Sequence, residues 1–194
     1  MVTHIALLRG INLGGHKRVA MPELREVVAG LGHTDVATYI QSGNVLFTPA
    51  QAGNAGPAGN AGLAAELEQA IAAKLGVQAR VLVLSREELA QVAAGNPYPG
   101  EPDPKNVHVI FLPGEPEPGH ADWLATAQQQ AADKGSRDEV QLVGRAVFLH
   151  TPAGFGRSEL ANLLSKAGGP SSARGAGTAR NWSTVTKLLA LCDS

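Results

Sequence analysis

The feature that most constrains the fold is an apolar run at residues 5–8, Ile-Ala-Leu-Leu, close to the start of the chain. Side chains of a strand alternate between two faces, so an unbroken apolar run makes both faces apolar. Such a strand belongs in the middle of a sheet that is covered on both sides. The run ends at Arg9 and is followed by a loop at residues 10–20 that is rich in glycine and basic side chains.

Hydrophobic periodicity and turn residues predict the other elements of the first half. A helix is expected after the loop, because Pro22 suits a first helical turn and Gly32 suits a helix end. Ser42 and Gly43 indicate a tight hairpin between two short strands. The expected elements cover residues 3–8, 21–31, 36–40, 45–48, 63–75 and 80–84, with the hairpin at 41–44. Their order, strand-helix-strand-strand-helix-strand, is that of a ferredoxin-like unit.

The second half repeats this order less regularly. Its expected strands cover residues 107–112, 139–143 and 145–150, with a short edge strand within 168–177, and its expected helices cover 121–132, 158–166 and 182–191. We therefore predict an α+β fold that consists of two duplicated ferredoxin-like subdomains. The duplication is one of element order and not of repeated sequence.

The predicted first subdomain comprises residues 1–95 and ends in a short helix that Ser85 and Glu88 begin as a capping box. Within it, residues 50–62 consist of alanine, glycine, asparagine, glutamine and proline, which predicts a flexible surface insertion. A proline-rich linker is expected at residues 96–106. The second subdomain, residues 107–194, closes with a C-terminal helix, for which Asn181 is the expected N-cap.

Composition limits the class of protein. Apolar residues make up 44% of the chain and charged residues 17%, which indicates a folded globular protein. The net charge of −1 lacks the positive excess of a general nucleic-acid binder, so any anion site must be local. The single Cys192 suits a reducing cytoplasm, and neither a membrane-spanning run nor a signal peptide is evident. We expect a cytoplasmic protein with no membrane partner.

The fold order predicts where a site should lie. A right-handed crossover keeps the first two strands parallel, so the loop after the first strand and the hairpin at 41–44 should meet at one edge of the sheet. Loop glycines, basic side chains and a helix start are the components of an anion site, and amide side chains add hydrogen bonds. The predicted ligand-binding residues are Arg9, Asn12, Gly14, Lys17, Arg18, Gln41, Ser42 and Asn44.

The same residues also fit a purely architectural role. Glycines are common in strand-to-helix loops, Ser-Gly is common in hairpins, and the run GINLGG matches neither a Walker P-loop nor GxGxxG. A secondary cluster has the same two interpretations. Arg157, Arg180 and Asn181 stand at the starts of two expected helices, where they either clamp an anion or cap helices while Trp182 packs in the core.

The sequence contains few candidates for a catalytic site. The 6 histidines show no metal-ligand spacing, there is no G-x-S-x-G elbow, and no carboxylate pair stands out for acid–base chemistry. We therefore predict no metal and no cofactor, and we name no catalytic residue.

A set of short motifs resembles the bacterial domain-of-unknown-function 1697 family. The motifs occur in order over nearly the whole chain and read ALLRGINLGG from Ala6, MPELR from Met21, YIQSGNVLF from Tyr39, DPKNVHV from Asp103, GRS from Gly156 and TARNWSTVTKL from Thr178. The resemblance implies duplicated ferredoxin-like subdomains and no assigned activity. Residues 50–62 and 167–177 look longer than the corresponding family segments.

The sequence is consistent with three functions. The first is binding of a phosphorylated small molecule, a nucleotide or a short nucleic acid, although scarce aromatics argue against stacking on single strands. The second is an enzyme that acts on a small polar anion in the same pocket, with Arg9 holding the anion and Ser42 or Asn44 taking part in chemistry. The third is a protein-interaction domain with no small ligand. The sequence indicates no oligomeric state.

Overall fold

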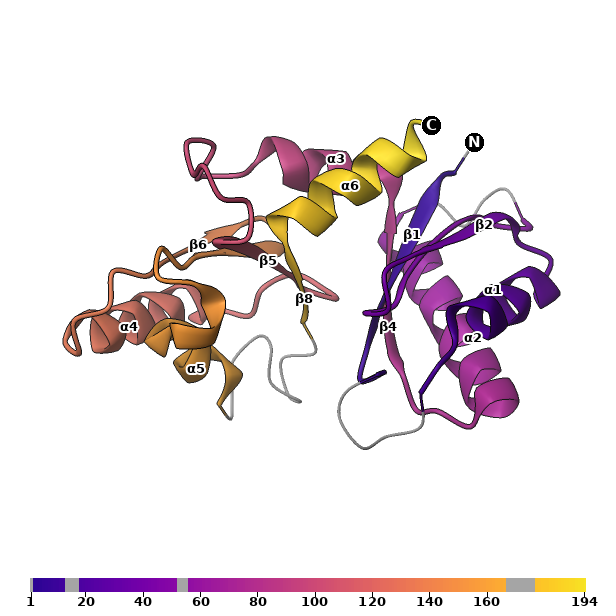
Figure 1. Ribbon diagram of the computed structural model, residues 1–194, viewed down its shortest axis with the longest axis horizontal. Helices are drawn as coiled ribbons and strands as arrows, with labels where there is room; N and C mark the ends of the chain where they lie inside the picture. Colours follow the sequence, from indigo (N-terminus) through magenta and orange to yellow (C-terminus); the bar gives the residue numbers. More distant parts are fainter. Residues whose placement is uncertain (1, 13–17, 52–55, 167–176) are drawn as a thin grey trace. The chain divides into compact units, whose positions relative to one another are not determined.

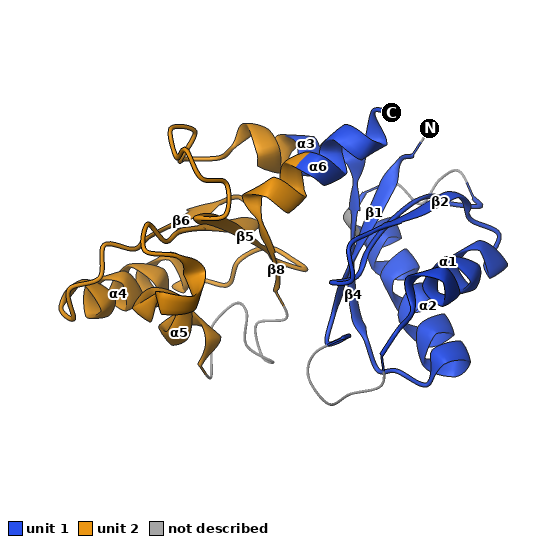
Figure 2. Cartoon of the chain, in the orientation of Figure 1, with its two compact units in different colours: residues 1–90, 187–194 blue, residues 91–186 orange. Residues whose placement is uncertain are grey.

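The computed structural model describes residues 2–12, 18–51, 56–166 and 177–194 (Figure 1). Within these ranges the chain forms two four-stranded antiparallel sheets, each with its own helices. The chain divides into unit 1, residues 1–90 with 187–194, and unit 2, residues 91–186 (Figure 2). The predicted α+β fold with two ferredoxin-like subdomains is confirmed, because both sheets have the strand order of that fold.

The sheet of unit 1 has the order β2-β3-β1-β4. Its strands are β1 (His4–Arg9), β2 (Thr34–Tyr39), β3 (Asn44–Thr48) and β4 (Arg80–Ser85). β1 pairs antiparallel with both β3 and β4, so it lies at the centre, as its apolar run predicts. β1 and β2 are both antiparallel to β3 and therefore run parallel to each other, which is the geometry expected for the first crossover.

Two helices cover one face of this sheet (Figure 1): α1 (Met21–Gly30) and α2 (Pro57–Leu75). Ala6 and Leu8 of β1 pack into the core that the two helices form with the sheet. Ile5 and Leu7 alternate to the opposite face, and both are fully buried. The apolar run is thus buried on both faces, as the sequence predicts.

α2 begins earlier than the sequence predicts. Its first residue is Pro57 and not Leu63, so residues 57–62 are helical and the expected flexible insertion at 50–62 is wrong for that part. The physical reason is a tertiary contact. Asn60 is buried, and its Nδ2 donates a hydrogen bond to Glu88 Oε2 at 2.6 Å. This bond anchors a helical turn whose Ala/Gly composition alone indicates a loop. Residues 52–55 of the expected insertion lie outside the described ranges.

The predicted capping box is confirmed at the start of α3 (Arg86–Ala94). The backbone N–H of Glu88 donates to Ser85 Oγ at 3.1 Å, and the backbone N–H of Ser85 donates to Glu88 Oε2 at 2.9 Å. Within unit 1, Arg86 Nε also donates to Asp193 Oδ1 at 2.6 Å, which ties the end of the chain to the start of α3.

The sheet of unit 2 has the order β6-β7-β5-β8. The unit comprises β5 (Val107–Phe111), α4 (His120–Ala132), β6 (Glu139–Val143), β7 (Ala146–His150), a 3-10 turn (Phe155–Arg157), α5 (Glu159–Ser165) and β8 (Thr178–Asn181). The last helix, α6 (Trp182–Cys192), begins in unit 2, and its residues from 187 onward belong to unit 1. Ile110 and Val147 of the sheet pack with Leu124 of α4 and Leu160 of α5 in one core. The predicted hairpin around Gly144 is confirmed.

The last strand lies later than expected. The sequence places a short edge strand within residues 168–177, but β8 is Thr178–Asn181, and residues 167–176 lie outside the described ranges. β8 has no run of β-branched residues, and it is a strand because it pairs with β5, with Arg180 opposite Val109. The expected N-cap of α6 is confirmed, since the backbone N–H of Thr184 donates to Asn181 Oδ1 at 2.9 Å.

Residues 96–106, the proline-rich segment, are held against β7 of unit 2. Glu101 Oε2 lies 2.5 Å from His150 Nε2, and Glu101 Oε1 accepts hydrogen bonds from the backbone N–H of Asp103 and from Asn106 Nδ2. The ring of Tyr98 stacks on His150 with centroids 5.0 Å apart. Burial raises the pKa of Tyr98 to about 12, so its hydroxyl stays protonated.

Candidate functional site

The loop after β1 and the β2–β3 hairpin meet at one edge of unit 1, as the fold order predicts. The backbone N–H of Leu8 donates to the carbonyl of Gly43 at 2.8 Å, and Asn12 Nδ2 donates to the carbonyl of Gln41 at 2.8 Å. We call this place, residues 9–20 with 40–44, the loop–hairpin edge. It brings together residues that are about 30 positions apart in the sequence.

Asn12 organises the loop side of this edge. Its backbone has φ 54°, in the left-handed region that asparagine tolerates better than most residues. Its Oδ1 accepts from the backbone N–H of Val19 at 2.8 Å, and its Nδ2 also reaches the carbonyl of Val19 at 3.2 Å. The side chain therefore joins positions 12 and 19 and attaches both to the hairpin.

Asn44 has a similar role in the hairpin. The residue is fully buried, and its Nδ2 donates to the carbonyl of Tyr39 at 2.9 Å and to Ser42 Oγ at 3.2 Å. Its amide nitrogen is therefore engaged within the turn. The sequence predicts Asn44 as a ligand contact, and the structure places it beneath the turn, where it supports the exposed Gln41 and Ser42.

The hairpin backbone is strained where it faces solvent. Ile40 has φ 51° although its side chain is β-branched, and it is 48% exposed. Left-handed backbone costs a residue with a Cβ about 1–2 kcal/mol. Gly43, at φ 81°, packs so closely that an added Cβ would lie 2.5 Å from Ile11 Cδ1. Gly43 supplies the positive φ of the hairpin that the sequence predicts, whereas the strain at Ile40 has no signal in the sequence.

Three arginines supply positive charge near this edge. Arg18 is exposed and makes no hydrogen bond or ion pair with any residue that the structure describes. Arg9 is half-buried at the end of β1 and lies opposite Arg80 of β4, a neighbour that sequence patterns missed because strand register depends on pairing. Arg80 is paired with Glu68 at 3.5 Å. The predicted Gly14 and Lys17 lie outside the described residues.

The start of α1 adds backbone donors beside the loop. Its N-cap, Ala20, has no side chain that accepts a hydrogen bond, and the first intrahelical bond there runs from the N–H of Leu24 to the carbonyl of Ala20. The N–H groups of the first turn therefore lack a side-chain cap. Together with Arg18 they add local positive charge, although Pro22 has no N–H and the acidic Glu23 lies in the same turn.

The secondary cluster is only partly brought together in unit 2. Arg180 and Asn181 are consecutive residues of β8, so their side chains leave opposite faces of the sheet. Asn181 caps α6, and Arg180 Nη1 donates to the carbonyl of Ala179 at 2.8 Å. Burial lowers the pKa of Arg180 to about 10. Arg157 is exposed in the 3-10 turn and lines a pocket to which neither of the other two contributes.

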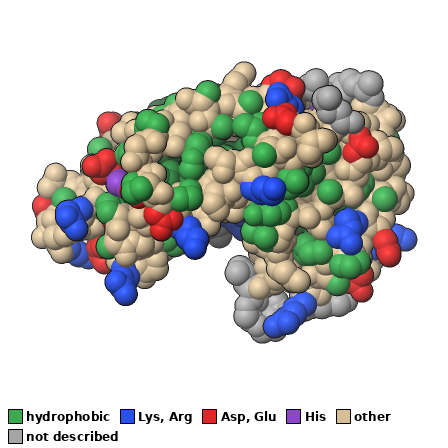
Figure 3. All heavy atoms as spheres, turned by 45° about the horizontal axis from the view of Figure 1, so that its top comes forward, with side chains coloured by type: hydrophobic (Ala, Val, Ile, Leu, Met, Phe, Trp, Pro, Cys, Tyr) green, Lys and Arg blue, Asp and Glu red, His purple; other side chains and the backbone are tan. Residues whose placement is uncertain are grey.

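Outside these two clusters, the described residues give few further indications of a site. On the face shown in Figure 3, Lys and Arg side chains of the described residues lie interspersed with Asp and Glu, so positive charge there is local. Across the described ranges, no group of three or more His, Cys, Asp or Glu residues is placed to hold a metal ion. No helix among those residues is both long and apolar enough to cross a membrane.

Comparison with known proteins agrees with this architecture of two ferredoxin-like units. The model of the family described as "Protein of unknown function (DUF1697)" matches residues 1–148. The chain belongs to this family, as the motif resemblance predicts. The structure of conserved bacterial protein SP0830 from Streptococcus pneumoniae is similar, with a TM-score of 0.67 and 24% identity over 98% of each chain. That likeness shows a shared fold. No curated protein matches the chain.

Proposed function

We propose that this protein binds a phosphorylated small molecule or nucleotide at the loop–hairpin edge of unit 1. The observation that carries the proposal is the Asn12–Gln41 hydrogen bond, which holds a basic loop against an exposed turn. The edge offers Arg18 without a partner among the described residues, uncapped N–H groups at the start of α1, and the exposed side chains of Gln41 and Ser42. Guanidinium and backbone N–H donors are the groups that bind phosphate in proteins.

Strain at the turn supports the same proposal. Asn12 and Ile40 both have positive φ although they carry a Cβ, and both lie at the loop–hairpin edge. Backbone in such conformations is concentrated at ligand-binding sites, and it persists only where the surrounding structure holds it in place. Ile40 also presents an exposed apolar side chain, which suits contact with the non-phosphate part of a ligand.

Thermal unfolding in the presence of ligands tests the proposal. A nucleoside monophosphate is titrated against the wild type, Arg18→Ala and Lys105→Ala. A ligand at 100 times its Kd stabilises the fold by about 2.7 kcal/mol. We expect this stabilisation to be lost in Arg18→Ala and kept in Lys105→Ala, which removes an exposed positive charge from unit 2. Equal responses of the two variants contradict the proposal.

A short nucleic acid is a second ligand with the same phosphate chemistry. It would differ from a small molecule in its salt dependence, because each phosphate contact releases condensed counterions. We expect binding of a short oligonucleotide to weaken steeply between 50 and 200 mM salt only if several phosphates are contacted. A shallow dependence, comparable to that of a mononucleotide, favours the small molecule.

An enzyme at the same edge has less support. Asn44, one of the two residues that could take part in chemistry, is buried with its amide nitrogen bonded inside the turn. A catalytic role needs a group within hydrogen-bond reach to take a proton. The geometry therefore favours binding over chemistry.

A further inference from the structure

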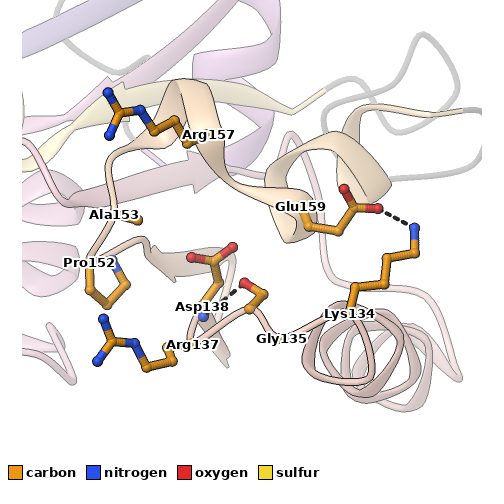
Figure 4. Close-up of a pocket in the computed structure, with 9 residues that line it drawn as sticks. Lys134, Gly135, Arg137, Asp138, Pro152, Ala153, Arg157 and Glu159 are labelled. Atoms are coloured by element: carbon orange, nitrogen blue, oxygen red, sulfur yellow. Dashed lines mark hydrogen bonds and ion pairs between the residues drawn. The ribbon is translucent and has the colours of Figure 1, made fainter.

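We propose that unit 2 carries a separate binding site for a small phosphorylated sugar or polyol, in a pocket between the α4–β6 and β7–α5 connections (Figure 4). The pocket has a volume of about 390 Å³ and is lined by residues 134–138 and by residues of the segment 152–159. That volume is within the range of small-molecule sites in proteins, about 300–1,000 Å³. None of its residues belongs to the loop–hairpin edge, so this inference does not depend on the function proposed for unit 1.

Three basic side chains line the pocket, and one of them is paired with a carboxylate while two are not. Lys134 forms an ion pair with Glu159, and this pairing lowers the pKa of Glu159, so its carboxylate stays charged and is neutralised by the lysine. Arg137 and Arg157 are exposed, and their side chains make no hydrogen bond or ion pair with any residue in the described part of the chain. Two guanidinium groups thus remain available to a ligand.

The two free arginines flank the part of the pocket that is remote from the Lys134–Glu159 pair. Figure 4 shows Arg157 and Arg137 on opposite sides of Pro152 and Ala153, with both side chains extending away from that pair. Each guanidinium is a planar fork of donors that matches the oxygens of a phosphate group. This end of the pocket therefore suits the dianionic group of a phosphate ester.

Asp138 gives the rest of the pocket a different character. It is buried, and its Oδ2 accepts hydrogen bonds from Ser158 Oγ at 2.8 Å and from the backbone N–H of Leu160 at 3.4 Å. Its Oδ1 accepts no hydrogen bond from the described residues. An uncompensated carboxylate oxygen attracts hydroxyl donors and repels an anion. The ligand that satisfies both ends carries a phosphate at one end and hydroxyl groups at the other.

Isothermal titration calorimetry with ribose 5-phosphate, ribose and inorganic phosphate tests this assignment. Wild-type protein is compared with Arg137→Ala, Arg157→Ala and the double variant, and Arg18→Ala is the matched control in unit 1. We expect ribose 5-phosphate to bind more tightly than inorganic phosphate, ribose not to bind, and the double variant to weaken binding at least about tenfold. Arg18→Ala should leave this affinity unchanged.

Three results would overturn the assignment. These are a flat titration of the wild type with millimolar ribose 5-phosphate, equal affinity for ribose 5-phosphate and inorganic phosphate, and an affinity that both arginine substitutions leave unchanged. Amide chemical-shift changes of the 15N-labelled full chain provide a second measurement. We expect ribose 5-phosphate to shift the resonances of Gly135 and Ser136, which line the pocket. Shifts confined to unit 1 would contradict the proposal and support the loop–hairpin edge instead.

Discussion

Asn12 donates a hydrogen bond from its side-chain amide to the backbone carbonyl of Gln41 at 2.8 Å and thereby joins the loop after β1 to the β2–β3 hairpin. The same side chain accepts from the backbone N–H of Val19, so one residue links position 19 to the hairpin through position 12. The candidate ligand site of unit 1 depends on this link, and its energetic value can be measured.

Replacing Asn12 with alanine should destabilise the protein by about 1–3 kcal/mol. The change removes the hydrogen bonds of the side-chain amide and leaves at φ 54° a residue that tolerates the left-handed region less well than asparagine. Asn12→Gly separates the two causes, since glycine accepts the backbone conformation but not the hydrogen bonds. Urea unfolding gives both free energies. Wild-type stability of Asn12→Ala would show that the bridge is not needed for the fold.

Replacing Ile40 with asparagine should stabilise the protein by up to about 1 kcal/mol. The residue has φ 51° and is 48% exposed, so relief of left-handed strain outweighs the apolar contact that is lost. Ile40→Val is the control, because valine keeps the β-branch and therefore the strain. If the asparagine variant also loses ligand affinity at the loop–hairpin edge, the strain serves binding. A less stable Ile40→Asn protein refutes the idea that the turn is strained.

Gly43→Ala should be among the most damaging single substitutions, at about 2–4 kcal/mol. A Cβ there would lie 2.5 Å from Ile11 Cδ1 and 2.8 Å from Leu8 Cβ, in addition to the cost of φ 81°. Gly144→Ala is a matched control, since Gly144 also has positive φ, 55°, but nothing lies within 4 Å of an added Cβ. We expect Gly144→Ala to cost about 1 kcal/mol, measured by the same unfolding assay. Equal losses at both positions would mean that packing at Gly43 is unimportant.

The stability of the protein should fall as the pH is lowered from about 6.5 to about 4, in part because of His108. Burial lowers the pKa of His108 to about 4 from the ordinary 6.5, and its ring contacts that of Phe155 in a tilted arrangement with centroids 4.2 Å apart. The unfolded chain therefore takes up the proton first, which favours unfolding across that range. His108→Gln should flatten this part of a plot of unfolding free energy against pH. An unchanged slope in the variant would exclude His108 as a cause.

Local patterns in the sequence predicted much of the fold correctly. The central position of β1 follows from its apolar run, the Ser85–Glu88 capping box begins α3, and Asn181 caps α6. These features depend on residues a few positions apart, whose contacts backbone geometry determines. The meeting of the loop and the hairpin was also predictable, because chain handedness leaves one arrangement for this order of elements.

What the sequence alone determined is the order of elements, the central strand, the helix caps and the edge where loop and hairpin meet. Tertiary structure alone decided the early start of α2, through Asn60 and Glu88, and the place of β8 beside β5. It also brought Arg137 and Arg157 to one pocket and strained Ile40. The physical reason is the same in each case. These features depend on partners far apart along the chain, and a residue's local propensity carries no information about such partners.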